Sequence, residues 1–258
     1  MKQYENLSIR DHFMFGKICQ DINNSQLILS ALLNRNVILT NSGVEHYMQE
    51  YSTSKFIRLD LLAIDECGSV FNAEMQNKST NLKRQHELPF RSRYYQALVD
   101  SSVVKEGMDY MDMPETYIIF ICTYDPFGLN LPQYIIESSC REAPLLDYND
   151  KSHKIFFNTT ANLNSLPPST KNMLEYIEKG KVTDRTTQHL NNVINNAIAK
   201  EIWKGDYMLT VVHDKDLYKD GFDSGYQSRQ DEVNQLQKEV EEKDAIISQL
   251  KAQIKELQ

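Results

Sequence analysis

The chain has 258 residues, of which 41% are hydrophobic and 25% charged, and its formal net charge is -8. This length and hydrophobic content allow a folded core. The negative net charge does not indicate a nucleic-acid binder, which normally carries an excess of Lys and Arg. The longest apolar run, Tyr117–Cys122, is far short of the ~20 residues of a membrane helix, and no signal peptide opens the sequence, so we expect a cytoplasmic protein without a membrane span.

The charge is unevenly distributed along the chain. Residues 214–258 carry eleven acidic and seven basic side chains, which is half of the acidic excess. The most basic stretch runs from Lys78 to Lys105 and holds Lys78, Lys83, Arg84, Arg91, Arg93 and Lys105 against two acids. The four cysteines form no Cys-x-x-Cys pair, which argues against a zinc knuckle or a disulfide framework.

The first part of the chain predicts helices followed by strands. Apolar spacing over Ile9–Leu33 indicates two helices, with Asn24 or Ser25 capping the second. A first strand is expected at 44–51. The segment 55–76 then reads as a hairpin, because two short apolar runs flank Glu66-Cys67-Gly68, and Gly68 can adopt positive φ.

The middle of the chain alternates a helix with buried strands. The pattern over 87–104 indicates a helix with Pro89 in its first turn, and Thr116–Thr123 is the clearest buried strand. Two further strands are expected at 134–139 and 154–158. This order predicts an α/β or α+β fold in which helices flank a mixed central sheet.

The C-terminal part predicts helices and a coiled coil. A helical subdomain is expected over 166–213, after a core at 1–165, and a hinge at Gly221 and Gly225 opens the tail 214–258. Heptad a positions in the tail are apolar and β-branched, and most d positions are Leu, which favours a parallel two-stranded coiled coil and hence a homodimer. The alternative is a single solvated amphipathic helix. The residues are Val233, Val240, Ile247 and Ile254 at a, and Leu236, Lys243, Leu250 and Leu257 at d.

The hairpin holds the candidate site. The expected register sets Asp60 opposite Glu74, and the alternation of a strand puts Gln76 on the same face. Two carboxylates and an amide oxygen are hard donors that suit Mg²⁺, with Mn²⁺ as a substitute, and burying both charges without a cation would be unfavourable. The alternative is an edge hairpin whose Asp60 and Glu74 face water.

Other motifs give little support to other enzyme classes. No phosphate-binding glycine loop, serine-hydrolase elbow, zinc-protease motif or dinucleotide fingerprint occurs. The six histidines are widely separated, so each one alone is read as a surface or packing residue.

The motifs resemble a known family. Asp60, a spacer of thirteen residues and Glu74-Met75-Gln76 look like the PD-(D/E)XK nuclease motif with Gln in place of Lys. With four further segments, this motif makes the chain similar to the recombination-promoting nucleases, also described as PD-(D/E)XK nuclease family transposases. The similarity covers about residues 5 to 215. These segments are Asp11–Lys17, Arg91–Tyr95, Phe120–Gly128 and Ile155–Thr159.

The resemblance implies a restriction-endonuclease-like fold and a bacterial, Mg²⁺-dependent DNA endonuclease. By motif position Asp60 and Glu74 would bind the metal, and Gln76 would occupy the catalytic Lys position and orient water or complete the metal shell. Asp11 matches the N-terminal motif, where it could cap a helix. We expect Lys78, Arg91 and Arg93 to contact the DNA backbone with weak sequence preference.

Because Gln76 is neutral, the sequence also allows a second function for the protein. An amide cannot act as a general base or stabilise charge as Lys does. The alternative is therefore a catalytically inactive, nuclease-like interaction protein that assembles through its coiled coil.

Overall fold

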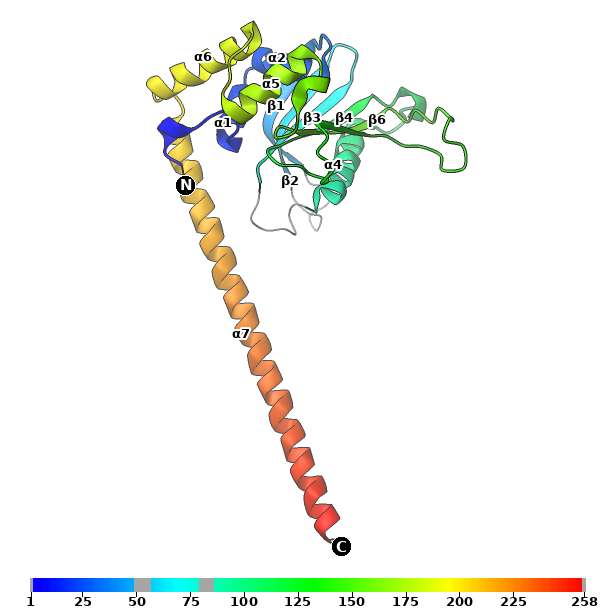
Figure 1. Cartoon of the computed structure of the whole chain (residues 1–258). Helices are drawn as coiled ribbons and strands as arrows, with labels where there is room; N and C mark the ends of the chain where they lie inside the picture. The colour runs from blue at the N-terminus through cyan, green and yellow to red at the C-terminus, as the bar shows by residue number, and fades with distance from the viewer. Residues whose placement is uncertain (1, 49–56, 79–85, 257–258) are drawn as a thin grey trace. The chain divides into compact units, whose positions relative to one another are not determined.

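The computed structural model describes residues 2–48, 57–78 and 86–256, and Figure 1 shows their arrangement. Contacts divide the chain into two compact units, Met1–Trp203 and Lys204–Gln258. The first unit is built on one six-stranded sheet with the order β1-β2-β3-β4-β6-β5. The strands are β1 (Leu39–Met48), β2 (Ile57–Asp65), β3 (Val70–Gln76), β4 (Thr116–Cys122), β5 (Gln133–Ile136) and β6 (Ser152–Asn158).

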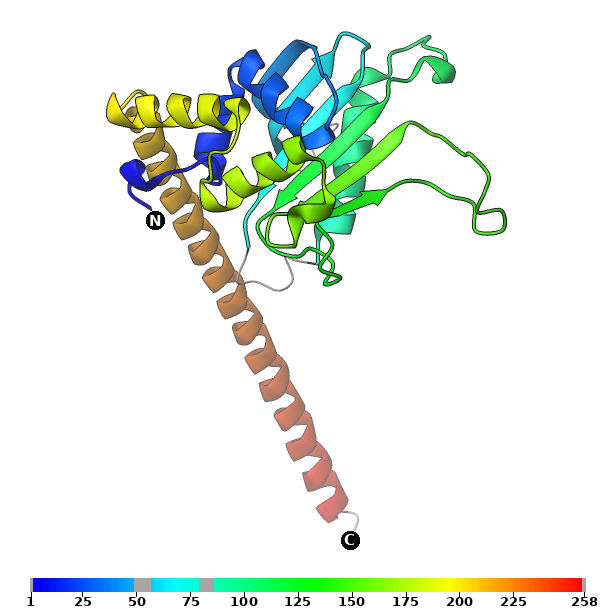
Figure 2. The same cartoon turned by 45° about the horizontal axis from the view of Figure 1, so that its top comes forward.

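Helices flank this sheet on both faces. The α-helices of the first unit within the described residues are α1 (His12–Cys19), α2 (Ile22–Leu33), α4 (Leu88–Val103), α5 (Pro168–Lys179) and α6 (Arg185–Ala199). β1, β2 and β3 pair antiparallel, β3, β4 and β6 pair in parallel, and β5 returns antiparallel on β6. α4 covers one face of the sheet, and α2 and α5 lie over the other (Figure 1, Figure 2). The predicted mixed, restriction-endonuclease-like sheet flanked by helices is therefore confirmed.

The core sits between the centre of the sheet and α4. All of β4 is buried, as its unbroken apolar run predicts. Phe120 of β4 stacks on Phe156 of β6 with ring centroids 5.5 Å apart, and Tyr95 of α4 packs into the same cluster. Pro89 falls in the first turn of α4, where its missing N–H leaves no helical hydrogen bond unmade. α4 therefore runs along the sheet, with Arg91 at the carboxyl end of β3 and Gln96 bonded to Thr116 at the amino end of β4.

Two expected boundaries are corrected. α2 is capped by Asp21, whose carboxylate accepts a hydrogen bond from Asn23 N, and not by Asn24 or Ser25. Those two side chains are buried and donate instead to carbonyl groups at the end of α1, a tertiary contact that local pattern does not reveal. β1 begins at Leu39, earlier than the expected 44, because it pairs with β2 from there. The expected end of this strand, 49–51, lies outside the described residues.

The C-terminal helices differ in how they are held. α5 packs on α2, where Thr170 Oγ1 donates to Ala31 O over 2.9 Å, and Tyr4 Oη donates to Ala197 O in α6 over 3.1 Å. Both helices therefore fall in the first unit with the sheet. α7 (Lys204–Glu256) forms the second unit as one continuous helix, and Gly221 and Gly225, where the sequence suggests a hinge, lie inside it. No described helix is both long and apolar enough to span a membrane.

Candidate active site

The β2–β3 hairpin brings two carboxylates together. Leu61 pairs with Ala73, so the next pair outward sets Asp60 opposite Glu74, as the sequence predicts. The turn is closed by Asp65, whose Oδ1 accepts hydrogen bonds from Cys67 N and Ser69 N, and Gly68 has a φ of 83°. This turn fixes the register and with it the pairing of the two acids.

The two acidic residues are locked to each other's strands. Asp60 N donates to Glu74 Oε1 over 3.0 Å, and Met75 N donates to Asp60 Oδ2 over 3.0 Å. Asn72 Nδ2 adds a second hydrogen bond to Glu74 Oε1 over 2.8 Å. Because each carboxylate is held by a backbone amide, neither can rotate freely. The pair is oriented before any ligand arrives.

Glu74 lies in an environment that disfavours its charge. The residue is only 3% exposed. Burial, with a smaller contribution from the charge of Asp60, raises the pKa of Glu74 from 4.5 to about 8, against opposing contributions from Asn72, the Asp60 amide and Arg91. Near neutral pH this carboxyl group therefore holds a proton or needs a cation beside it.

Gln76 and Arg91 meet at the edge of this cluster. Arg91 Nη1 donates to Gln76 Oε1 over 2.7 Å, and Arg91 Nη2 donates to Tyr95 Oη over 3.0 Å. The guanidinium also lies 5.4 Å from the ring centroid of Tyr95 and 5.5 Å from that of Phe120. Burial lowers the pKa of Arg91. The charge and hydrogen bond of Tyr95, with the charges of Glu74 and Asp60, raise this pKa by more, so the net shift is upward and the guanidinium stays charged.

The three predicted DNA contacts are thus divided between two environments. Arg91 turns inward to the acidic pair, whereas Arg93 and Lys78 are exposed. Residues two apart on a helix do not share a face, which separates Arg91 from Arg93. The neighbouring Lys83 and Arg84 lie outside the described residues.

In the N-terminal motif it is His12, and not Asp11, that contacts the acidic pair. Asp11 directly precedes α1, but its side chain does not cap the helix; it accepts hydrogen bonds from Ser8 N, Ser8 Oγ and Lys2 Nζ. The following residue, His12, places Nδ1 3.2 Å from Asp60 Oδ2. His12 is therefore a site residue that its isolated position in the sequence did not reveal, although it stands inside the Asp11–Lys17 motif.

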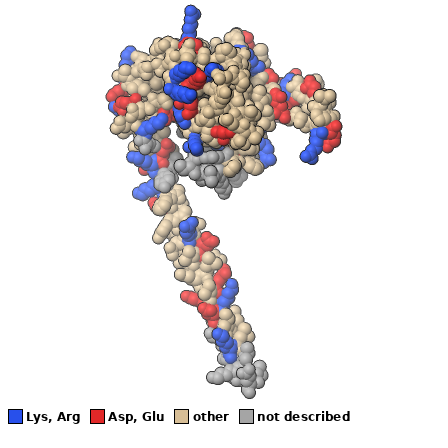
Figure 3. Space-filling view, in the orientation of Figure 1, with Lys and Arg blue, Asp and Glu red and all other residues tan. Residues whose placement is uncertain are grey.

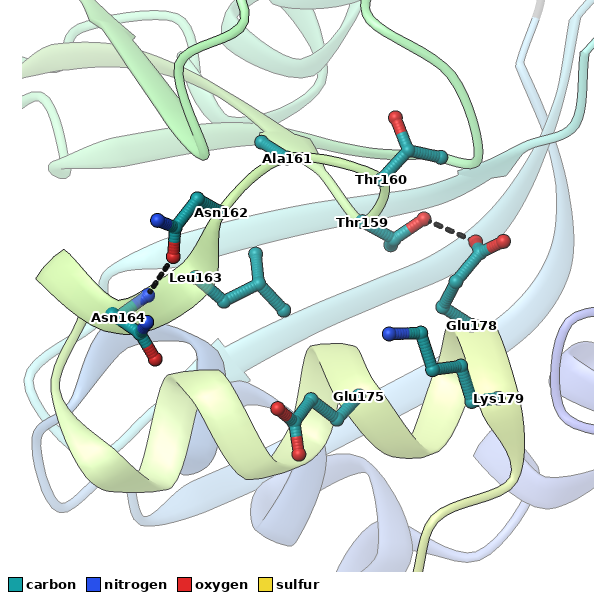
Figure 4. A pocket seen from close by; sticks show the side chains of 9 residues that line it. All are labelled: Thr159, Thr160, Ala161, Asn162, Leu163, Asn164, Glu175, Glu178 and Lys179. Carbon is teal, nitrogen blue, oxygen red and sulfur yellow. Dashed lines mark hydrogen bonds between the residues drawn. The ribbon is translucent and has the colours of Figure 1, made fainter.

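A polar pocket lies on the α5 side of the same sheet edge. It encloses about 400 Å³ and is lined by Thr159–Asn164 with Glu175, Glu178 and Lys179 (Figure 4). Glu178 accepts a hydrogen bond from Thr159 Oγ1 over 2.5 Å and pairs with Arg10 at 3.0 Å. Asn77, directly after β3, donates to Arg10 O. These contacts tie the N-terminal segment, β6 and α5 together beside the end of β3.

The donor set at Asp60 and Glu74 fits a hard divalent cation. No group of three or more His, Cys, Asp or Glu side chains suited to a metal occurs among the described residues. Mg²⁺, however, is commonly held by one or two carboxylates, with water and substrate phosphate completing its shell. Hydrogen bonds within the described chain use Oδ2 of Asp60 and Oε1 of Glu74. Oδ1 of Asp60 and Oε2 of Glu74 take part in none of these hydrogen bonds.

Comparison with known protein families gives a match. A family model described as PD-(D/E)XK nuclease family transposase matches residues 14–141, close to half of the chain. The matched region runs from α1 to just beyond β5 and contains Asp60, Glu74, Gln76 and Arg91. No curated protein and no solved structure matches the chain.

Proposed function

Since the chain belongs to the PD-(D/E)XK nuclease family transposases, we propose that it is a Mg²⁺-dependent DNA endonuclease with low sequence specificity. The observation that carries the proposal is the interlocked pair of Asp60 and Glu74. One of the two is almost fully buried and its pKa is raised to about 8. A structural hairpin has no need for two facing acids that disfavour each other's charge. A cation site explains both the pairing and the burial.

Each residue of the cluster has a defined part in this reaction. Asp60 and Glu74 would hold Mg²⁺, or Mn²⁺ in its place. A bound ion would lower the pKa of a coordinated water and offset negative charge on the scissile phosphate. Gln76 would orient water by donating from Nε2, or complete the metal shell through the second lone pair of Oε1, which also accepts a hydrogen bond from Arg91.

Arg91 supplies the positive charge that the usual lysine would provide. Its guanidinium is held against Gln76 Oε1 and Tyr95 Oη. It acts on the carboxylate pair through its charge, as its effect on the pKa of Glu74 indicates. We therefore assign Arg91 to the reacting centre, and Lys78 and Arg93 to contacts with the DNA backbone. Contacts to phosphates alone carry no base information, hence the weak sequence preference.

The wider setting of the proposed nuclease follows the same reasoning. The apolar a and d positions of α7 favour a homodimer through a coiled coil. A cytoplasmic location in a bacterium fits the scattered cysteines and the family.

The direct test is cleavage of supercoiled plasmid DNA with Mg²⁺ or Mn²⁺. We expect the wild type to nick the plasmid and Asp60→Ala to be inactive. Glu66→Gln is the matched control, because this exposed acid lies in the turn of the same hairpin, outside the cluster. Equal nicking by the wild type and Asp60→Ala would sink the proposal, since the activity would then come from elsewhere.

A second candidate is an inactive, nuclease-like interaction protein. The neutral Gln76 and the small number of metal-binding side chains in the described cluster favour it. Thermal unfolding during a Mn²⁺ titration separates the two candidates. A retained metal site raises the melting temperature of the wild type and not that of Glu74→Ala, because only the folded state binds the ion. No rise in the wild type would favour the interaction protein.

A further inference from the structure

The heptad pattern of α7 extends beyond the segment that predicts the coiled coil. Counting back from Val233 and Leu236, the same two positions recur through the first half of the helix. All of the residues concerned are exposed. They are Val212, Lys219 and Tyr226 at a, and Lys215, Phe222 and Arg229 at d.

Basic residues are concentrated on one of the two positions. Lys215, Arg229 and Lys243 occupy every second d position, and apolar residues stand between them. Position a carries a single base, Lys219, among apolar and aromatic residues. The two edges of the seam therefore differ in charge.

This difference bears on how two such helices can pair. In a parallel pair each d residue meets its own copy, so Lys215, Arg229 and Lys243 would make three like-charge contacts. The flanking positions do not separate the two orientations, because acids predominate at both: Asp216, Asp223 and Asp244 at e, and Glu232 and Glu239 at g. In an antiparallel pair each d residue meets an a residue instead. The three basic side chains would then face apolar or aromatic residues in most registers.

From this charge pattern we infer that α7 pairs antiparallel with α7 of a second copy of the chain. The inference rests on the proposed dimer and changes its geometry, since β-branched a and Leu d positions alone would favour a parallel pair. In an antiparallel pair the two nuclease units are attached at opposite ends of the helical pair. One dimer then makes separate nicks and does not cut both strands at one place.

A second copy fits this surface better than a nucleic acid does. Over 204–258 acidic side chains number twelve and basic ones eight. Figure 3 shows acidic and basic side chains interspersed along the exposed helix. A polyanion would meet more repulsion than attraction, whereas a second α7 covers the apolar positions.

The orientation can be measured with single spin labels. Cys67 and Cys140 are first replaced by Ser, because the other two cysteines are buried. Labels at Ser224→Cys, Asp231→Cys, Lys238→Cys and Ala245→Cys all lie at heptad position f, away from the seam. In an antiparallel dimer the distance between the two labels changes by about 3 Å per residue moved, twice the helical rise. In a parallel dimer it stays constant.

The outcomes separate the orientation from the dimer itself. A dimeric mass with distances that vary along α7 supports both. A dimeric mass with constant distances overturns the antiparallel inference and leaves the proposed dimer standing. A monomeric mass overturns both, because the orientation depends on the dimer.

A charge substitution tests the cause. Replacing Lys215, Arg229 and Lys243 together by Leu removes the three like-charge contacts and leaves a seam that favours parallel pairing. We expect the label distances to become constant along the helix. Lys238→Leu, labelled at the other three positions, is the control at the outer surface and should leave the varying distances unchanged. Varying distances in the triple variant would show that the basic residues do not set the orientation.

Discussion

The hairpin site and α7 show two different relations between side chains and their surroundings. Asp60 and Glu74 are held by backbone amides inside a packed sheet, and their chemistry comes from burial. The apolar side chains of α7 are exposed; Leu236 is 53% and Leu250 52% accessible. The hairpin site is therefore fully formed within a single chain. An exposed seam requires a partner before its residues have a defined environment.

The largest effect is expected at the buried acid. Glu74→Gln keeps the shape and the hydrogen bond from Asn72 but removes a metal ligand. Cleavage should fall by on the order of a thousandfold. Plasmid nicking at saturating Mg²⁺ measures this. Retained cleavage would mean that Glu74 is buried for structural reasons and that the contrast with α7 does not concern catalysis.

The same acid makes metal-free stability depend on pH. Its pKa is raised on folding, from 4.5 to about 8, so its stabilising contribution is complete below 4.5 and is lost as pH rises through 8. The melting temperature of the metal-free protein should therefore fall between pH 5 and 9. Glu74→Gln, which cannot ionise, should remove this part of the fall. An equal pH profile for both proteins would contradict the assigned burial effect.

A smaller effect is expected at the inward arginine. Arg91→Gln removes the charge beside Gln76 and should lower kcat by roughly 10- to 100-fold, as loss of a group supporting a metal site does. Arg93→Gln is the matched control on the same helix. It should raise KM and change kcat little, since Arg93 is exposed. Steady-state cleavage of a short duplex separates the two, and equal effects on KM would place Arg91 among the DNA contacts.

The smallest effect is expected in α7. Leu236→Ala should change the free energy of unfolding of the first unit by less than about 0.5 kcal/mol, because an exposed residue outside special features contributes little. It should weaken self-association, however. Denaturant unfolding and light scattering measure the two properties. A large loss of stability in the first unit would show that the two units are energetically coupled.

The sequence predicted those elements whose signals are local. The buried run of β4, Pro89 at the start of α4 and the register of the β2–β3 hairpin all depend on neighbouring residues, and all are confirmed. The cap at Asp21 was missed because Asn24 and Ser25 bond to the end of α1 instead. That choice is made by tertiary packing.

The candidate site was predicted in part for the same reason. Asp60, Glu74 and Gln76 share two adjacent strands, so alternation and register place them together. His12 comes from α1 and reaches Asp60 only after the helix has packed against the sheet. The contact between Arg91 and Tyr95 spans four residues of α4, a spacing that helical periodicity predicts. The contact of Arg91 with Gln76 joins α4 to β3, and periodicity within α4 gives no information about it.

The length of the turn Glu66-Cys67-Gly68 determines how the two acidic residues are paired. Its three residues decide which side chain of β2 stands opposite Glu74. One residue more or fewer in the turn would shift the pairing, and if β3 and the rest of the sheet stayed in place, Asp60 would point to the opposite face. The carboxylate pair therefore depends on the number of residues in a solvent-exposed turn as strictly as on the identity of its own two members.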